Sequence, residues 1–124
     1  MPPLQTGNLA YDRPGGEVSP ETAARPIDMA HLARQTMGDR ALEQEVLQLF
    51  AQQAVAVRKQ LSAASPTERI RLAHGLKGSA RGVGAFAIAE CVASLETRPD
   101  DAKALDRLSF LIDQVCDFIS AIHR

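Results

Sequence analysis

The apolar residues between Ile27 and Ile122 recur at intervals of three and four, and no stretch alternates polar and apolar residues as a strand would. The pattern is most regular near the C-terminus, where it comprises Leu105, Leu108, Ile112, Val115, Ile119 and Ile122. A stripe of this spacing lies along one side of a helix and needs other helices to cover it. We therefore expect an all-α fold.

Start and stop signals divide this region into five helices, expected over about 28–36, 40–63, 66 to 82 or 84, 85–97 and 100–122. The third start is the clearest, because Ser65 stands at the cap, Pro66 at the first helical position and Glu68 three residues after the cap. The helix at 40–63 carries an apolar stripe made of Leu42, Val46, Leu49, Phe50, Val57 and Leu61. Four long helices with short connections predict an up-and-down four-helix bundle preceded by a short helix.

Residues 1–26 differ from the rest, since they hold five of the seven prolines and three of the eight glycines and show no apolar periodicity. They predict a mostly irregular N-terminal arm, with one short helical turn at 19–24. The domain boundaries that we expect are therefore 1–26 for the arm and 27–124 for one bundle domain. A chain of 124 residues is long enough for a single hydrophobic core.

Composition excludes several classes of function. The formal net charge of −1 gives no electrostatic reason to expect nucleic acid or an anionic membrane as a partner. No apolar run approaches the ~20 residues of a membrane span, and the N-terminus lacks a signal-peptide pattern, so we expect the protein in the cytoplasm.

Cys91 and Cys116 lie in apolar helical contexts and are expected to be buried free thiols.

Residues 73–85, AHGLKGSARGVGA, place one histidine and four glycines in a helical pattern. Each glycine in a helix interior costs about 1 kcal/mol relative to alanine. At about 100° per residue, the apolar residues Leu72, Leu76 and Val83 lie opposite His74. We therefore expect the His74 ring to face solvent.

The glycines extend along the same side of this helix. Gly78 is one turn beyond His74, and Gly75 and Gly82 lie further round the helix. We interpret them as a strip without side chains that lets a partner's surface approach the ring. Two other interpretations are close packing against another helix and, for Gly82 and Gly84, the end of the helix.

Cations surround this histidine in the sequence. Residues 66–85 contain Arg69, Arg71, Lys77 and Arg81 against Glu68 alone, a local net charge of +3. Such surroundings suit a histidine that receives a phosphoryl group, because the cations screen the added negative charge. They also disfavour the imidazolium and leave a ring nitrogen free to attack. Arg69 lies near the edge of the core and is also explained by an ion pair with a neighbour.

The segment AHGLKGSARGVGA resembles the signature of histidine-containing phosphotransfer (HPt) domains, in which an alanine and the phosphorylated histidine precede x-Leu-Lys-Gly-Ser. The flanks IDMAHLARQTMGDRALEQEVLQLFAQQ and GAFAIAECVASLE are similar to the helices on either side in that family. The resemblance covers 27–122 and leaves the arm outside. It implies a four-helix bundle that relays phosphoryl groups.

Position by position, the resemblance implies a role for each matching residue. His74 would be the phosphoryl acceptor, through the ring nitrogen furthest from the backbone, and Lys77 would steady the phosphoryl group. Gly78 would leave room for the incoming active site, while Leu76 and Ala80 would be core. Gly75 departs from the larger polar residue that the family often has, which loosens the helix locally and removes no chemistry.

The family also implies partners, namely the receiver domains of response regulators and of hybrid histidine kinases. The receiver would supply an acidic site and its Mg²⁺, so the chain would need no cofactor of its own and would be a monomeric carrier without kinase activity. Ile70 is apolar yet lies on the His74 face, and we expect it to contact the partner together with Arg71, Arg81 and Gly82.

Two other classes of protein also expose a histidine or a basic face on a helix. The phosphoacceptor helix pair of a sensor kinase usually has an acidic residue after the histidine and a proline soon after, but here Gly75 follows and no proline comes before Pro99. A helical adaptor that binds through the same basic face without phosphoryl chemistry stays open. His31 and His123 match no motif, and no histidine or cysteine spacing predicts a metal site.

Overall fold

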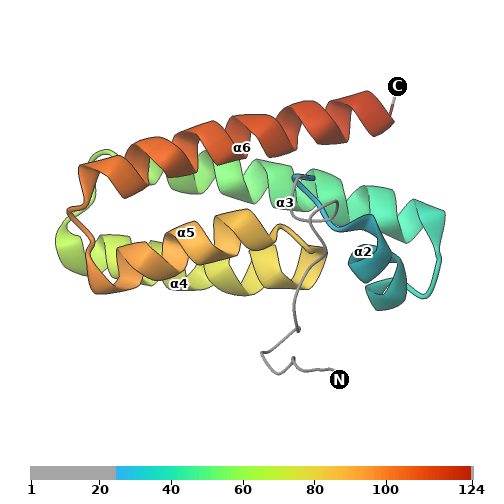
Figure 1. Ribbon diagram of the computed structural model, residues 1–124, viewed down its shortest axis with the longest axis horizontal. Helices are drawn as coiled ribbons and strands as arrows, with labels where there is room; N and C mark the ends of the chain where they lie inside the picture. The colour runs from blue at the N-terminus through green and yellow to red at the C-terminus, as the bar shows by residue number, and fades with distance from the viewer. Residues whose placement is uncertain (1–24, 124) are drawn as a thin grey trace, which may run out of the picture.

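The computed structural model describes residues 25–123, which are helical apart from the ends and short connections (Figure 1). The helices are α2 (Met29–Gln35), α3 (Arg40–Leu61), α4 (Pro66–Val83), α5 (Phe86–Thr97) and α6 (Ala102–Ile122). No strand occurs among the described residues, and the predicted all-α fold is confirmed. The predicted arm, with its helical turn at 19–24, lies outside the described residues except for Arg25 and Pro26.

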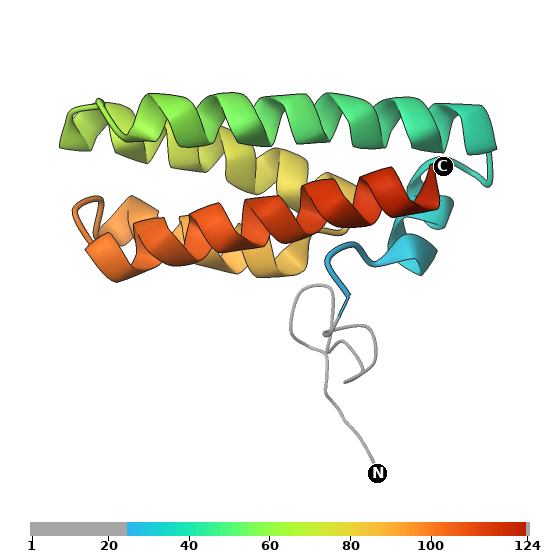
Figure 2. The ribbon, with the colours of Figure 1, turned by 90° about the horizontal axis from the view of Figure 1, so that it is seen from above.

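The four long helices form a closed ring in which each packs on two neighbours. Contacts join α3 to α4, α4 to α5, α5 to α6 and α6 back to α3, and both views show the helices running roughly parallel to one long axis (Figures 1 and 2). The short helix α2 lies at one end of the bundle and packs on α4. Within residues 25–123, no helix is long and apolar enough to cross a membrane.

Side-chain caps begin α2, α3, α4 and α6 close to the predicted positions, whereas α5 has none. The Asp39 and Asp101 carboxylates accept hydrogen bonds from the first turns of α3 and α6. Ser65 Oγ accepts the Glu68 N–H at 3.2 Å, as the sequence predicts. The Glu68 carboxylate, however, binds Arg71 one turn on rather than reaching back to the cap.

The core is continuous across all five helices, and α4 contributes Leu76 and Ala80, both fully buried as expected. The predicted stripe of α3 is partly wrong. Leu42 and Leu49 are 42% and 60% exposed, and Leu47 fills the core instead. Residues two positions apart on a helix are separated by a rotation of about 200°. Leu47 and Leu49 therefore point to opposite sides, and only one of them can be buried.

Both cysteines are free. Cys91 is buried and its thiol donates to the Ala104 carbonyl at 3.3 Å, whereas Cys116 is half-buried rather than buried as expected. Burial raises the pKa of both thiols. Since the thiolate is the reactive form, both cysteines are poor nucleophiles at neutral pH.

Gly84 ends α4 and also brings α2 close to it. Its φ of 91° is left-handed, and its N–H donates to the Ala80 carbonyl at 3.0 Å. Its own carbonyl accepts the Asp28 N–H at 2.9 Å. A Cβ at Gly84 would lie 2.8 Å from the Asp28 backbone oxygen, so no other residue fits here without movement of the backbone.

The Gly84→Ala substitution should therefore destabilise the bundle by about 2 kcal/mol or more, from the left-handed backbone and the contact with Asp28. The matched substitution Gly75→Ala places its methyl in open space within α4 and should stabilise by about 1 kcal/mol. Urea denaturation of both variants measures the two effects. Equal free energies of unfolding for the two variants would contradict this account of Gly84.

Candidate functional site

His74 lies in the middle of α4 and faces solvent, as the helical wheel predicts. Its side chain is 73% exposed, while Ala73 and Leu76 on either side of it in the sequence are fully buried. The rigid core of the bundle therefore fixes the backbone under a ring that is itself open to a partner.

A carboxylate from the neighbouring helix holds this ring. Glu96 Oε2 on α5 lies 2.8 Å from His74 Nδ1, and its other oxygen, Oε1, forms an ion pair with Lys77 Nζ. The Glu96 and Lys77 side chains are only 18% and 20% exposed, in contrast to the ring. One carboxylate thus joins the histidine to the lysine that follows it on α4.

The pKa of Glu96 is lowered from its ordinary value, first by the Lys77 hydrogen bond and then by the His74 hydrogen bond. The carboxylate is therefore ionised at neutral pH and can only accept hydrogen bonds. It follows that the His74 ring carries its hydrogen on Nδ1, which donates to Glu96. In the neutral ring the lone pair then lies on Nε2, the nitrogen furthest from the backbone, where it can act as a nucleophile.

The same shift makes the site sensitive to acid. Because the pKa of Glu96 is lower in the folded protein, its contribution to stability is present above the ordinary value of 4.5. It is lost as the pH falls through the lowered value. We therefore expect the arrangement of Glu96, Lys77 and His74 to be complete at physiological pH.

The three glycines of α4 lie on an open surface beside this site. A Cβ placed on Gly75, Gly78 or Gly82 would meet no atom of residues 25–123 within 4 Å. Close packing against another helix is therefore not the reason for them. Gly82 lies inside α4, so only Gly84 ends the helix.

The cations near His74 are largely paired, so carboxylates from outside 66–85 offset part of the net charge of +3 that this segment carries by itself. Arg69 binds Asp100 at 3.2 Å and two backbone carbonyls, Arg71 binds Glu68, and Lys77 binds Glu96. The count for 66–85 does not include Glu96 and Asp100, which follow later in the sequence and contact α4 only in the fold. Among the described residues, Arg81 is the exposed cation of this segment that forms no ion pair.

Exposed apolar side chains lie on α4 and on the helix α3 that packs against it. Ile70, expected there from the sequence, is 39% exposed. Leu49 of α3 is 60% exposed. The connection 62–65 joins α3 to the antiparallel helix α4. Leu49 is as many residues before the last residue of α3 as Gly78 is after the first residue of α4, so the two lie at the same level along the bundle. Leu49 was missed as a surface contact because the sequence stripe assigned it to the core.

The two other histidines lie elsewhere. His31 on α2 packs its ring edge-on against Phe86, with ring centroids 5.1 Å apart, and His123 follows α6. Each has one buried ring nitrogen without a hydrogen-bond partner among the described residues. Within 25–123, no group of three or more His, Cys, Asp or Glu side chains could hold a metal ion.

Comparison with known proteins agrees with this geometry. The family model described as "Hpt domain" matches residues 44–118, which is more than half of the chain. The chain therefore belongs to the Hpt domain family, and the resemblance found in the sequence is confirmed. Hpt domains transfer phosphoryl groups in phosphorelays, where they interact with receiver domains. No curated protein and no solved structure gives a significant match.

The Glu96→Ala substitution tests the tautomer. The wild-type ring should be protonated at Nδ1, and loss of the acceptor should shift the balance toward the Nε2-protonated form by about fivefold, the equivalent of one hydrogen bond. Ring ¹⁵N chemical shifts of His74 at pH 8 measure this balance. Glu90→Ala, which removes an exposed carboxylate from the same helix, is the control and should change nothing. An Nε2-protonated ring in the wild type would contradict the assignment.

Proposed function

We propose that this chain is a phosphocarrier whose His74 accepts a phosphoryl group from the phosphoaspartate of one receiver domain and passes it to the aspartate of another. The observation that carries the proposal is the exposed imidazole of an Hpt chain, hydrogen-bonded at Nδ1 by an ionised glutamate. That arrangement supports Nε2 as the reacting atom.

In the forward step the lone pair of Nε2 forms a bond to phosphorus as the bond from phosphorus to the aspartate oxygen breaks. The aspartate leaves as a carboxylate with the electron pair, so atoms and charge balance. The ring becomes positively charged as the nitrogen–phosphorus bond forms, and the Glu96 carboxylate stabilises that charge through Nδ1–H. Transfer to the next receiver is the reverse of this step.

Lys77 has a second role in this scheme. Its ammonium group is bound to Glu96 before the reaction and lies one turn from His74 on the same helix. Its flexible four-carbon stem lets the ammonium move to the phosphoryl oxygens once they arrive. We expect Lys77 to exchange part of its contact with Glu96 for the phosphoryl group, which steadies the phosphohistidine.

The partner would supply the remaining chemistry. A Mg²⁺ ion held by the receiver's acidic site would neutralise charge on the phosphoryl group in flight, and this chain would contribute no metal ligand. The carrier would act as a monomer in the cytoplasm, since one histidine and one docking face suffice for a one-to-one encounter with a receiver.

The docking face consists of the open glycine strip and the side chains around it. Gly78 and Gly82 allow close approach, and Ile70 and Leu49 offer apolar contacts. Arg81 forms no ion pair with residues 25–123 and offers its charge to an acidic receiver surface. Arg71 is also exposed but shares its charge with Glu68, so we expect it to contribute less.

The His74→Gln substitution should abolish labelling by a phosphorylated receiver. Purified receiver domains are phosphorylated and mixed with the carrier, and the label on the carrier is scored for loss in acid, as phosphohistidine requires. His123→Gln is the matched control and should be labelled like the wild type. Wild-type protein that binds receivers but never takes up acid-labile label would instead favour an adaptor that acts through the same face.

The docking face is tested by Ile70→Glu, which should slow transfer by about tenfold because it places a charge in an apolar contact opposite an acidic partner. Val55→Glu is the control, because Val55 is 41% exposed, close to the 39% of Ile70. Val55 lies on a different side of α3 from Leu49 and so outside the docking face. Rates are measured at receiver concentrations far below saturation. Equal rates for the two variants would remove Ile70 from the docking face.

A further inference from the structure

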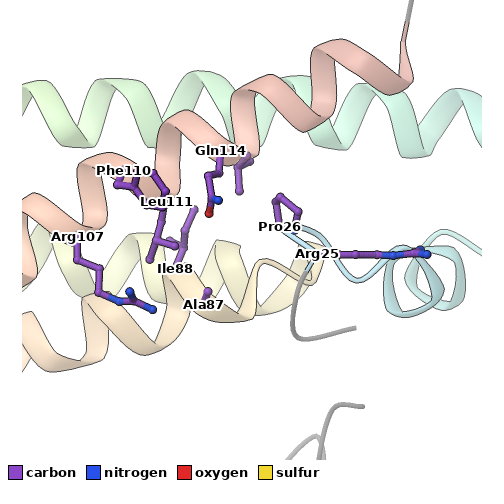
Figure 3. Close-up of a pocket in the computed structure, with 9 residues that line it drawn as sticks. Arg25, Pro26, Ala87, Ile88, Arg107, Phe110, Leu111 and Gln114 are labelled. Carbon is purple, nitrogen blue, oxygen red and sulfur yellow. The ribbon is translucent and has the colours of Figure 1, made fainter. Parts of the chain in front are cut away.

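A groove lies between α5 and α6, beside Arg25 and Pro26 (Figure 3). Ile88 and Leu111 line its middle, with Arg107 and Phe110 toward one end and Pro26 at the other. Its volume is about 190 Å³, room for one large side chain. Phe110 is 60% exposed, so much of its ring is open to contact from a segment that enters the groove.

We propose that the segment Leu9–Asp12 of the same chain docks in this groove, with the Tyr11 ring against Phe110 and the Asp12 carboxylate at Arg107. The first reason is the place where the chain reaches the groove. Arg25 and Pro26 line the groove, so everything that precedes them is tethered at its edge. Tyr11 is 14 residues from Arg25 in the sequence. The ends of a flexible chain of this length are about 20 Å apart on average.

The second reason is chemical fit. Tyr11 is the only aromatic residue among residues 1–24, and it stands between an apolar residue, Leu9, and the acidic Asp12. The groove offers the complementary set, with apolar walls, an exposed aromatic ring and Arg107, which forms no ion pair within the described part of the chain. Two aromatic rings attract beyond the area that they bury, and an aspartate pairs well with an arginine.

Docking at this groove leaves the phosphoacceptor side open. Ala87, which lines the groove, is nine residues before Glu96 on α5, a rotation of about 180°. The segment would therefore cover an apolar surface on the side of α5 that faces away from Glu96 and His74. The inference does not depend on the proposed phosphotransfer and can fail without affecting it.

The composition of the chain supplies the probe, because the protein has one tyrosine and no tryptophan. Tyrosine fluorescence of the full-length protein therefore reports on Tyr11 alone. The tether gives the segment an effective concentration of about 3 mM at the groove. If the groove binds the free segment with a Kd of about 1 mM, about three quarters of the molecules have the segment docked. Acrylamide should then quench the wild type about fourfold less strongly than a variant whose groove no longer binds.

Phe110→Ser is that variant, and Leu49→Ser is its control, since both side chains are 60% exposed and only Phe110 lines the groove. We expect strong quenching in Phe110→Ser, and quenching of Leu49→Ser equal to that of the wild type. Asp12→Arg should also release the segment, and adding Arg107→Asp should restore its protection. Equal quenching of the wild type and Phe110→Ser would overturn the proposal.

The concentration dependence of Tyr11 protection and the phosphoryl uptake of Phe110→Ser test the proposal further. Protection of Tyr11 that increases with protein concentration would overturn the proposal, because the segment would then come from another copy of the chain. Phosphoryl uptake by Phe110→Ser at the wild-type rate, together with exposed Tyr11, would support docking on a face separate from His74.

Discussion

The carboxylate of Glu96 connects the parts of this protein that its chemistry needs. It accepts hydrogen bonds from His74 and Lys77 on α4 while its own backbone belongs to α5, so the site exists only when these two helices are packed together. Gly84 ends α4 with a left-handed backbone and lets α5 begin two residues later. Tight pairing of two antiparallel helices thus sets Glu96 level with His74 and fixes which ring nitrogen is free.

The packed core of the bundle compensates for the low helix propensity of the glycines on the exposed side of α4. Gly75, Gly78 and Gly82 face open space within the described part of the chain, and each weakens the helix by about 1 kcal/mol. A core that runs through every helix holds α4 in place despite these losses. The result is an open helix surface beside the imidazole, which suits the proposed transfer of a phosphoryl group to and from a partner.

Much of this arrangement follows from local sequence. Helical periodicity predicts the bundle, the cap at Ser65 predicts the start of α4, and the helical wheel predicts that His74 faces outward. Glu96 could not be assigned to the site in this way, because it lies 22 residues from His74 and meets it only through tertiary packing. The local excess of cations was misleading for the same reason. Leu49 shows a different limit, since a stripe of spaced leucines does not say which of two close neighbours turns inward.

The role of Glu96 determines which atom of the histidine ring carries the phosphoryl group, and NMR can locate that atom. The protein is labelled with ¹⁵N-histidine, phosphorylated by a receiver domain at pH 8 and studied by long-range ¹H–¹⁵N NMR. We predict that phosphorus is bonded to Nε2 of His74 and that Nδ1 keeps its hydrogen bond to Glu96. Phosphorylation at Nδ1 of His74, or at His31 or His123, would contradict the role of Glu96 in leaving Nε2 free to react.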